Sequence, residues 1–114
     1  MTAEIAECSI ADLKAAWRTD EYILDVREPD EYAEGHVPSA VLIPLGEVGA
    51  RVEEVPLGRT VYVVCRSGRR SLTGARILAD AGRTAVSVRG GTMAWIAAGL
   101  PVSARPCHTD TISR

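Results

Sequence analysis

The strongest constraint on the fold is a cysteine that lies between a strand pattern and a helical pattern. Thr60–Val64 reads Thr-Val-Tyr-Val-Val, which is typical of a central strand in a parallel sheet. The apolar run stops at Cys65, and the loop that follows holds one glycine and three arginines. An amphipathic helical pattern begins directly after this loop. The sequence therefore predicts a thiol at the carboxyl end of a strand, facing the N-terminus of a helix.

That position favours ionisation of the thiol. A helix N-terminus carries about half a positive charge and exposes unpaired backbone N–H groups. The arginines of the loop add full positive charges. Both effects stabilise the thiolate, which is the nucleophilic form, and both attract an anionic substrate. We therefore interpret Cys65 as a nucleophile that acts on an anion.

Strand and helix patterns alternate along the rest of the chain. Ser9 and Asp12 have the spacing of a capping box for the first helix, and Thr92 is placed to cap the last one. The alternation predicts an α/β fold with an open, mainly parallel sheet of about five strands and helices on both faces. Ligands of such sheets bind beyond the carboxyl ends of the strands, where Cys65 is expected. The expected strands occupy residues 5–8, 22–26, 40–43, 60–64 and 84–88.

Length and composition narrow the class of protein. The 114 residues suggest one domain, expected over residues 1–102, followed by a polar, irregular tail over 103–114. The formal net charge of −2 and the lack of a basic motif argue against nucleic acid as a partner. No apolar run has the length of a signal peptide or a membrane span, so we expect no membrane association.

The cysteines indicate a reducing environment. Cys8, Cys65 and Cys107 are an odd set with no C-x-x-C motif and no metal-ligand spacing. We therefore expect a cytoplasmic protein without a metal centre or another cofactor. Cys8 is interpreted as a packed thiol and Cys107 as an idle thiol of the tail.

Three segments, in order, resemble the single-domain rhodanese family, whose fold is that of thiosulfate sulfurtransferases. The similarity spans roughly residues 9–102. The segments are Leu-Asp-Val-Arg-Glu at 24–28 with Glu-Tyr at 31–32, Gly-His-Val-Pro-Ser-Ala at 35–40 and Ile-Pro at 43–44; Cys-Arg-Ser-Gly-Arg-Arg-Ser at 65–71; and Gly-Gly at 90–91 with Ala-Trp at 94–95 and Gly-Leu-Pro-Val at 99–102.

The resemblance implies a two-step sulfur transfer. Cys65 would attack the outer sulfur of a small anionic donor such as thiosulfate, release sulfite and keep a persulfide. A thiol or cyanide acceptor, including a thioredoxin-like or other protein thiol, would then take the terminal sulfur. A cysteine with a lowered pKa suits both steps, because it is a good nucleophile and a good leaving group. Backbone N–H groups of residues 66–71 would hold the negative charge, and Gly68 would give the loop its shape.

The other loop side chains have alternative roles. At least one of Arg66, Arg69 and Arg70 is expected to bind the anionic substrate through its paired N–H donors, with Arg66 and Arg70 favoured because they flank the loop. Ser67 and Ser71 would either donate hydroxyl hydrogen bonds to the sulfur or cap the helix. Capping is the expected role of Ser71.

Four polar residues outside the loop are interpreted as structural. Asp25 and Arg27 end a strand at the same sheet edge, and we expect an internal ion pair that supports the site. Glu31 is expected to anchor the structure. His36 lies in a Gly-His-Val-Pro turn, so we do not expect a Cys–His dyad.

Three other functions compete with sulfur transfer. Phosphatases and arsenate reductases of this fold use Cys-x5-Arg, but the sixth position after Cys65 is Ser71, and Arg70 comes one residue early. A persulfide carrier or protein-interaction module in sulfur trafficking would share the same loop. A thiol sensor would pair Cys65 with Cys107 if the tail reached the loop.

Overall fold

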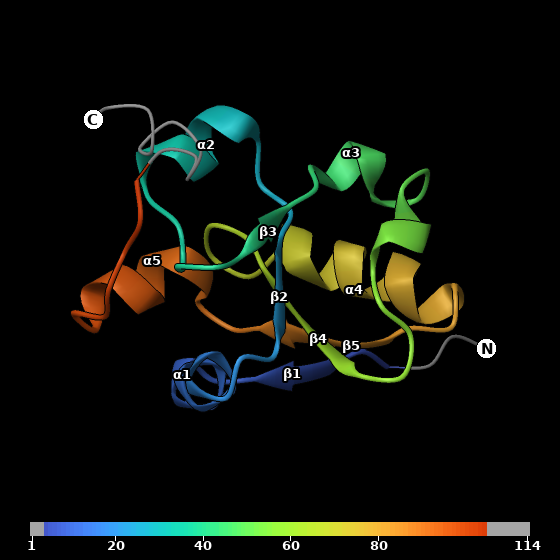
Figure 1. Ribbon diagram of the computed structural model, residues 1–114, viewed down its shortest axis with the longest axis horizontal. Coiled ribbons are helices and arrows are strands. Elements are labelled where there is room, and N and C mark those ends of the chain that lie inside the picture. Colours follow the sequence, from blue (N-terminus) through green and yellow to red (C-terminus); the bar gives the residue numbers. More distant parts are fainter. Residues whose placement is uncertain (1–3, 105–114) are drawn as a thin grey trace.

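The structure, a computed structural model, describes residues 4–104, which form one parallel five-stranded sheet in the order β1-β5-β4-β2-β3 (Figure 1). All four pairings between neighbouring strands are parallel. The predicted α/β fold is therefore confirmed, and β4, which precedes Cys65, is the central strand. The strands are β1 (Ala6–Cys8), β2 (Tyr22–Asp25), β3 (Val41–Leu42), β4 (Thr60–Val64) and β5 (Thr84–Val88).

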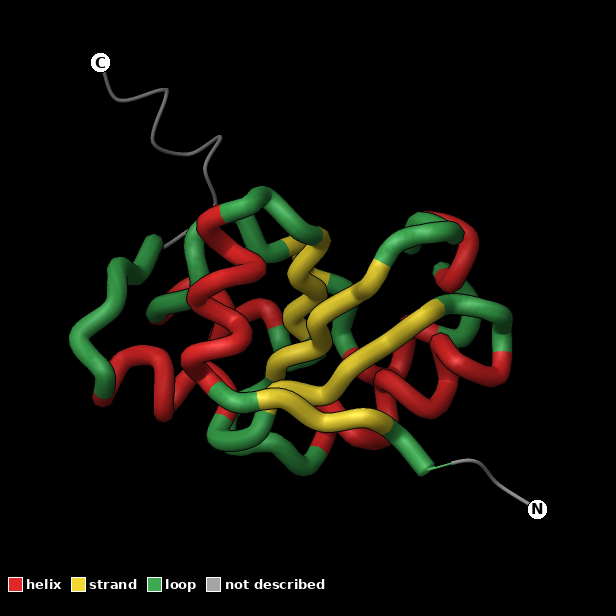
Figure 2. Tube along the Cα trace, turned by 90° about the horizontal axis from the view of Figure 1, so that it is seen from below, coloured by secondary structure: helices red, strands yellow, loops and turns green. Residues whose placement is uncertain are grey.

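Helices cover both faces of the sheet. Figure 2 shows the strands running between two groups of helices. Among residues 4–104, no helix is long and apolar enough to cross a membrane. The helices are α1 (Ile10–Arg18), α2 (Pro29–Glu34), α3 (Leu45–Val48), α4 (Arg70–Asp80) and α5 (Gly91–Ala97), with a short 3₁₀ turn at Val52–Glu54.

The alternation of side chains along β4 explains why this strand is apolar throughout. Val61 and Val63 pack with the α3 and α4 side of the core, where Leu78 is also buried. Val64 lies in the opposite cluster with Leu13 of α1 and Trp95 of α5. Successive side chains of a strand point to opposite faces, so a strand with a helix layer on each side needs apolar residues at both sets of positions.

The helix starts follow the sequence prediction at α1 but not at α5. Ser9 caps α1, and its capping box with Asp12 is formed, with the Asp12 backbone nitrogen 3.1 Å from Ser9 Oγ. The prediction that Thr92 caps α5 is wrong, because the N-cap is Gly90, which has a positive φ of 81°. Thr92 lies inside the first turn, and its buried hydroxyl has no hydrogen-bond partner among residues 4–104.

The folded part extends to Ser103, the first residue of the expected tail. Its backbone pairs with that of His36 in an antiparallel bridge, with N–O distances of 2.8 and 2.9 Å. This bridge fastens the chain after α5 to the loop after α2. Cys107 and the other residues of the expected tail after residue 104 lie outside the described residues.

Gly91 provides a direct test of how α5 is seated. Its φ of 57° is left-handed, and a Cβ there would overlap the carbonyl oxygen of Cys65 and lie 2.7 Å from that of Arg66. We expect Gly91→Ala to lower the free energy of unfolding by about 2–4 kcal/mol, because left-handed strain and overpacking add. Urea unfolding measures the change.

Gly82→Ala is the matched control for this prediction. Gly82 also has a positive φ, of 88°, but nothing lies within 4 Å of its added Cβ. In the control, the free energy of unfolding should therefore fall by only about 1–2 kcal/mol, the cost of the left-handed conformation. Equal losses in the two variants would show that the close approach of Gly91 to the loop contributes nothing.

Candidate active site

Cys65 lies at the carboxyl end of β4, and the loop after it leads directly into α4. The predicted capping of α4 by Ser71 is wrong. The N-cap is Arg69, which makes no side-chain capping bond, and Ser71 is the second residue of the helix. Its side chain is fully buried and turns back toward the sulfur, with Ser71 Oγ 3.6 Å from Cys65 Sγ. Of the two roles open to Ser71, the structure shows the contact with sulfur.

The loop curls around the sulfur atom. The backbone N–H of Gly68 donates to Cys65 Sγ at 3.1 Å. Gly68 has a φ of 114°, and a Cβ there would lie 3.3 Å from the backbone nitrogen of Gly90. A side chain at this position would therefore be strained and crowded, so the shape of the loop depends on glycine as predicted.

Hydrogen bonds within the loop lower the pKa of the Cys65 thiol. Burial is the largest single influence and raises the pKa, since it penalises the charged form. The Ser71 hydroxyl and the backbone N–H groups of Ser71, Gly68 and Ser67 act in the other direction, and together they outweigh burial. The predicted contribution of the helix start to the low pKa is present, because Ser71 lies in the first turn of α4, whereas the arginine charges are not among the causes.

The first turn of α5 holds the loop from outside. The backbone N–H of Thr92 donates to the Cys65 carbonyl at 2.8 Å, and that of Met93 donates to the Arg66 carbonyl at 3.0 Å. These are donors that a helix start leaves without partners inside the helix. The Ser67 N–H, which belongs to the same peptide as the Arg66 carbonyl, is one of the groups that lower the pKa of Cys65.

The three loop arginines have different surroundings. Arg70 forms a bidentate pair with Glu31 of α2, with two N–O distances of 2.8 Å. This hydrogen-bonded pair lowers the pKa of Glu31 to about 2. Arg70, one of the two arginines expected to bind substrate, therefore also links α4 to α2. Arg66 and Arg69 are exposed and have no side-chain partner in the described part of the chain.

The expected ion pair between Asp25 and Arg27 is present and buried. Arg27 Nη2 lies 2.8 Å from Asp25 Oδ2 and also donates to the Gly35 carbonyl at 2.9 Å. The pair therefore ties the end of β2 to the turn after α2. His36 is buried beside it, stacks on Tyr32 and has its Nδ1 2.7 Å from the Tyr32 carbonyl, which agrees with a structural role.

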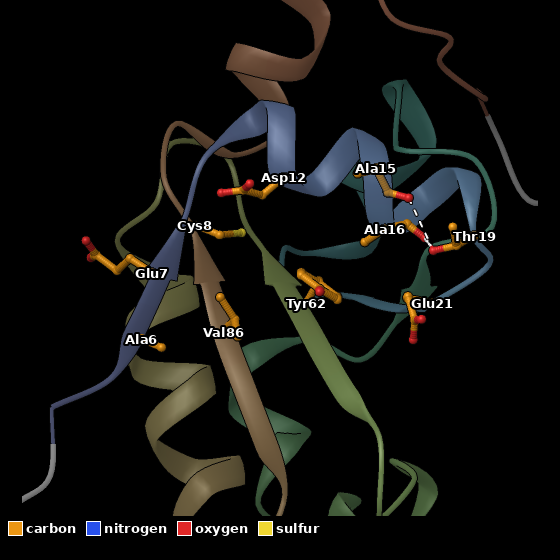
Figure 3. A pocket seen from close by; sticks show the side chains of 10 residues that line it. All are labelled: Ala6, Glu7, Cys8, Asp12, Ala15, Ala16, Thr19, Glu21, Tyr62 and Val86. Carbon is orange, nitrogen blue, oxygen red and sulfur yellow. Dashed lines mark hydrogen bonds between the residues drawn. The ribbon is translucent and has the colours of Figure 1, made fainter.

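A cavity that lies away from the loop is larger than the one beside the loop. A cavity of about 530 Å³ opens between α1 and the sheet, with Cys8, Asp12 and Tyr62 in its wall (Figure 3). Burial, and then the charge of Asp12, raise the pKa of Cys8 to about 11, so this thiol is a poor nucleophile. A smaller cavity of about 220 Å³ lies beside the loop, where Arg66 and Met93 line it. The lowered pKa of Cys65, rather than the size of a cavity, therefore marks the loop as the candidate active site.

Ser87 belongs to the site but was not predicted from the sequence. It is buried on β5, and its Oγ lies 2.8 Å from Ser71 Oγ. The one signal in the sequence is a serine within the otherwise apolar end of a strand, just before Gly90 and Gly91. Within residues 4–104, no group of three or more His, Cys, Asp or Glu side chains could hold a metal ion.

Comparisons with known proteins agree with this geometry. The family model "Rhodanese-like domain" matches residues 9–98. The putative sulfurtransferase YtwF of Bacillus subtilis is 42% identical over 94 residues, which cover 81% of this chain and 91% of that protein. The thiosulfate sulfurtransferase PspE of Escherichia coli is 40% identical over 73 residues, which cover 62% of this chain and 70% of that protein. A crystal structure of a rhodanese-related protein from Thermoplasma volcanium, 31% identical, aligns with a TM-score of 0.80 over 86% of this chain and 97% of that one.

The opposite pKa shifts of two thiols predict selective alkylation. At neutral pH, iodoacetamide should modify Cys65 at least about tenfold faster than Cys8, because the thiolate is the reactive form. Peptide mapping after timed quenching measures both sites in one sample. Comparable rates in the folded protein would contradict the assignment, whereas comparable rates in urea are the expected control.

The Glu31–Arg70 pair predicts a pH-dependent contribution to stability. The folded-state pKa of Glu31 lies below its ordinary value, so the pair stabilises the fold above pH 4.5 and loses this contribution as the pH falls toward about 2. The urea midpoint of Glu31→Gln should therefore fall less steeply over this range than that of the wild type. Glu34→Gln, on the same helix, should follow the wild-type curve, and a parallel curve for Glu31→Gln would contradict the prediction.

Proposed function

The chain belongs to the Rhodanese-like domain family, and from this premise we propose that it transfers a sulfane sulfur from thiosulfate or a related anion to a thiol or cyanide acceptor. Sulfur transfer as a general activity is supported by the relatives named as sulfurtransferases. The donor is proposed because the name of the Escherichia coli relative specifies thiosulfate. The acceptor includes protein thiols, such as those of thioredoxin-like proteins, and the proposed location is the cytoplasm.

One observation carries the proposal: a buried sulfur with a lowered pKa, held by hydrogen-bond donors of its own loop. In the first step the Cys65 thiolate attacks the outer sulfur of thiosulfate. A new S–S bond forms, the old one breaks, and its electron pair leaves with sulfite. The product is a persulfide whose negative charge remains close to the same N–H groups.

The second step returns the enzyme to its starting state. The acceptor thiolate or cyanide attacks the terminal sulfur of the persulfide, and the S–S electron pair returns to Cys65. The products are an acceptor persulfide or thiocyanate, together with the Cys65 thiolate. The lowered pKa of Cys65 increases the thiolate fraction, so the proposed mechanism assigns no general base to this step.

The exposed arginines are proposed to bind the donor. Arg66 and Arg69 lie in the loop and have no side-chain partner among residues 4–104, so their guanidinium groups are available to the sulfonate oxygens of thiosulfate. Arg70 is engaged by Glu31 and is proposed to support the loop rather than to bind the donor.

The geometry weighs against phosphate or arsenate chemistry. Enzymes with the Cys-x5-Arg loop hold the transferred oxyanion with the arginine at the sixth position. That position is Ser71 here, and its side chain is buried against Ser87. A persulfide carrier would use the same loop, and it differs from an enzyme only in whether the sulfur is turned over repeatedly.

Intact mass after thiosulfate treatment tests the proposal. The wild type should gain the mass of one sulfur atom, and cyanide should remove it. Cys65→Ser should gain none because its hydroxyl is a far weaker nucleophile, whereas Cys8→Ser should behave as the wild type does. Sulfur retained by Cys65→Ser would contradict the assignment. Stoichiometric loading without catalytic thiocyanate formation would favour the carrier.

A further inference from the structure

Three buried side chains form a row that ends at the sulfur of Cys65. Cys65, Ser71 and Ser87 come from the end of β4, the first turn of α4 and strand β5, and each is no more than 1% exposed. Cys65 Sγ lies 3.6 Å from Ser71 Oγ, and Ser71 Oγ lies 2.8 Å from Ser87 Oγ. Ser87 makes no other side-chain hydrogen bond within the described part of the chain. The row is therefore a short, closed chain of hydrogen bonds.

A count of protons shows which state this row favours. When Cys65 is a thiol, the three groups carry three protons, but the row contains only two contacts. One S–H or O–H then has no acceptor within the row, which is costly for a buried donor. When the thiol proton has left, two protons serve two contacts: Ser87 donates to Ser71, and Ser71 donates to sulfur.

We propose that Ser87 is a positioning residue for Cys65: its hydroxyl donates to Ser71 Oγ and thereby directs the Ser71 proton toward the sulfur. Ser87 touches neither the sulfur nor any substrate, so it acts only through Ser71. The inference rests on the proposed role of Cys65 as the nucleophile. It concerns the ionisation of this thiol, which is measured without any sulfur donor.

The same arrangement persists through the proposed reaction cycle. In the persulfide, the inner sulfur also carries no proton and remains an acceptor for Ser71. The row therefore keeps its direction in the free thiolate and in the loaded state. The charged groups on the elements around Cys65 are present in all the variants below: the Asp25–Arg27 pair after β2, the Glu31–Arg70 pair between α2 and α4, and the exposed Arg66 and Arg69 of the loop.

A double-mutant cycle over Ser71 and Ser87 tests the proposal. The readout is the iodoacetamide alkylation rate of Cys65 against pH, followed by peptide mapping. Ser87→Ala should move the midpoint of the curve of rate against pH to higher pH. At pH values below this midpoint, the alkylation rate should fall by roughly three- to tenfold, which is the effect of one hydrogen bond. The plateau at high pH should remain at the wild-type rate. In the Ser71→Ala background, Ser87→Ala should cause no further shift.

Two further variants separate positioning from a general change in packing. Ser87→Cys keeps a side chain of similar size with a weaker donor, so its midpoint should lie between those of the wild type and Ser87→Ala. Thr84→Ala removes an exposed hydroxyl from the same strand and should leave the midpoint unchanged. Urea unfolding of each variant measures stability independently.

The outcomes are distinct. A wild-type midpoint in Ser87→Ala or Ser87→Cys would overturn the proposal, as would a Ser87 effect that persists without the Ser71 hydroxyl. If Ser87→Ala does not fold, Ser87→Cys alone decides the matter through its midpoint. Failure of sulfur loading with the predicted midpoint shifts intact would overturn the proposed function while leaving this inference standing.

Discussion

The site depends above all on the seating of α5 against the cysteine loop. Two backbone N–H groups of α5 bind the carbonyls of Cys65 and Arg66, and Gly91 is the residue whose lack of a side chain permits this approach. A carbonyl that is bound on the outside of a tight loop fixes the peptide plane, and with it the direction of the adjacent N–H group. The reactive thiol is thus controlled by a segment that lies more than 25 residues later in the sequence.

Two ion pairs lie near the cysteine loop and join the elements around it. The buried Asp25–Arg27 pair reaches the Gly35 carbonyl, and the partly exposed Glu31–Arg70 pair joins α2 to α4. Among the arginines of the cysteine loop, Arg66 and Arg69 have no side-chain partner within residues 4–104, whereas Arg70 is paired. If the proposed function holds, charge at this site has two separate uses, which are to fix the structure and to attract an anion.

Sequence reasoning succeeded where local physics decides the outcome. The strand before Cys65, the capping box of Ser9 and the need for Gly68 follow from residues close in sequence. It failed at Ser71 and Thr92, and it did not show the pairing of Arg70 with Glu31, because these features depend on partners from other elements. The parallel register of β4 with β5 brings Ser87 behind Ser71, and Arg70 finds its partner 39 positions away. Spacing within a loop does not report such contacts, so roles within the motif were harder to predict than the motif itself.

Because Cys65 is buried, the two halves of the proposed reaction differ in how closely the reactant must approach this residue. The free thiolate is only 1% exposed, so a reagent must approach it with a slender tip, such as the single outer sulfur of thiosulfate. After the proposed first step, the reacting atom is the terminal sulfur, which lies about 2 Å from Cys65 Sγ, the length of one S–S bond. In the proposed cycle the donor therefore has to reach Cys65 Sγ itself, whereas the acceptor has to reach only the sulfur atom bonded to it.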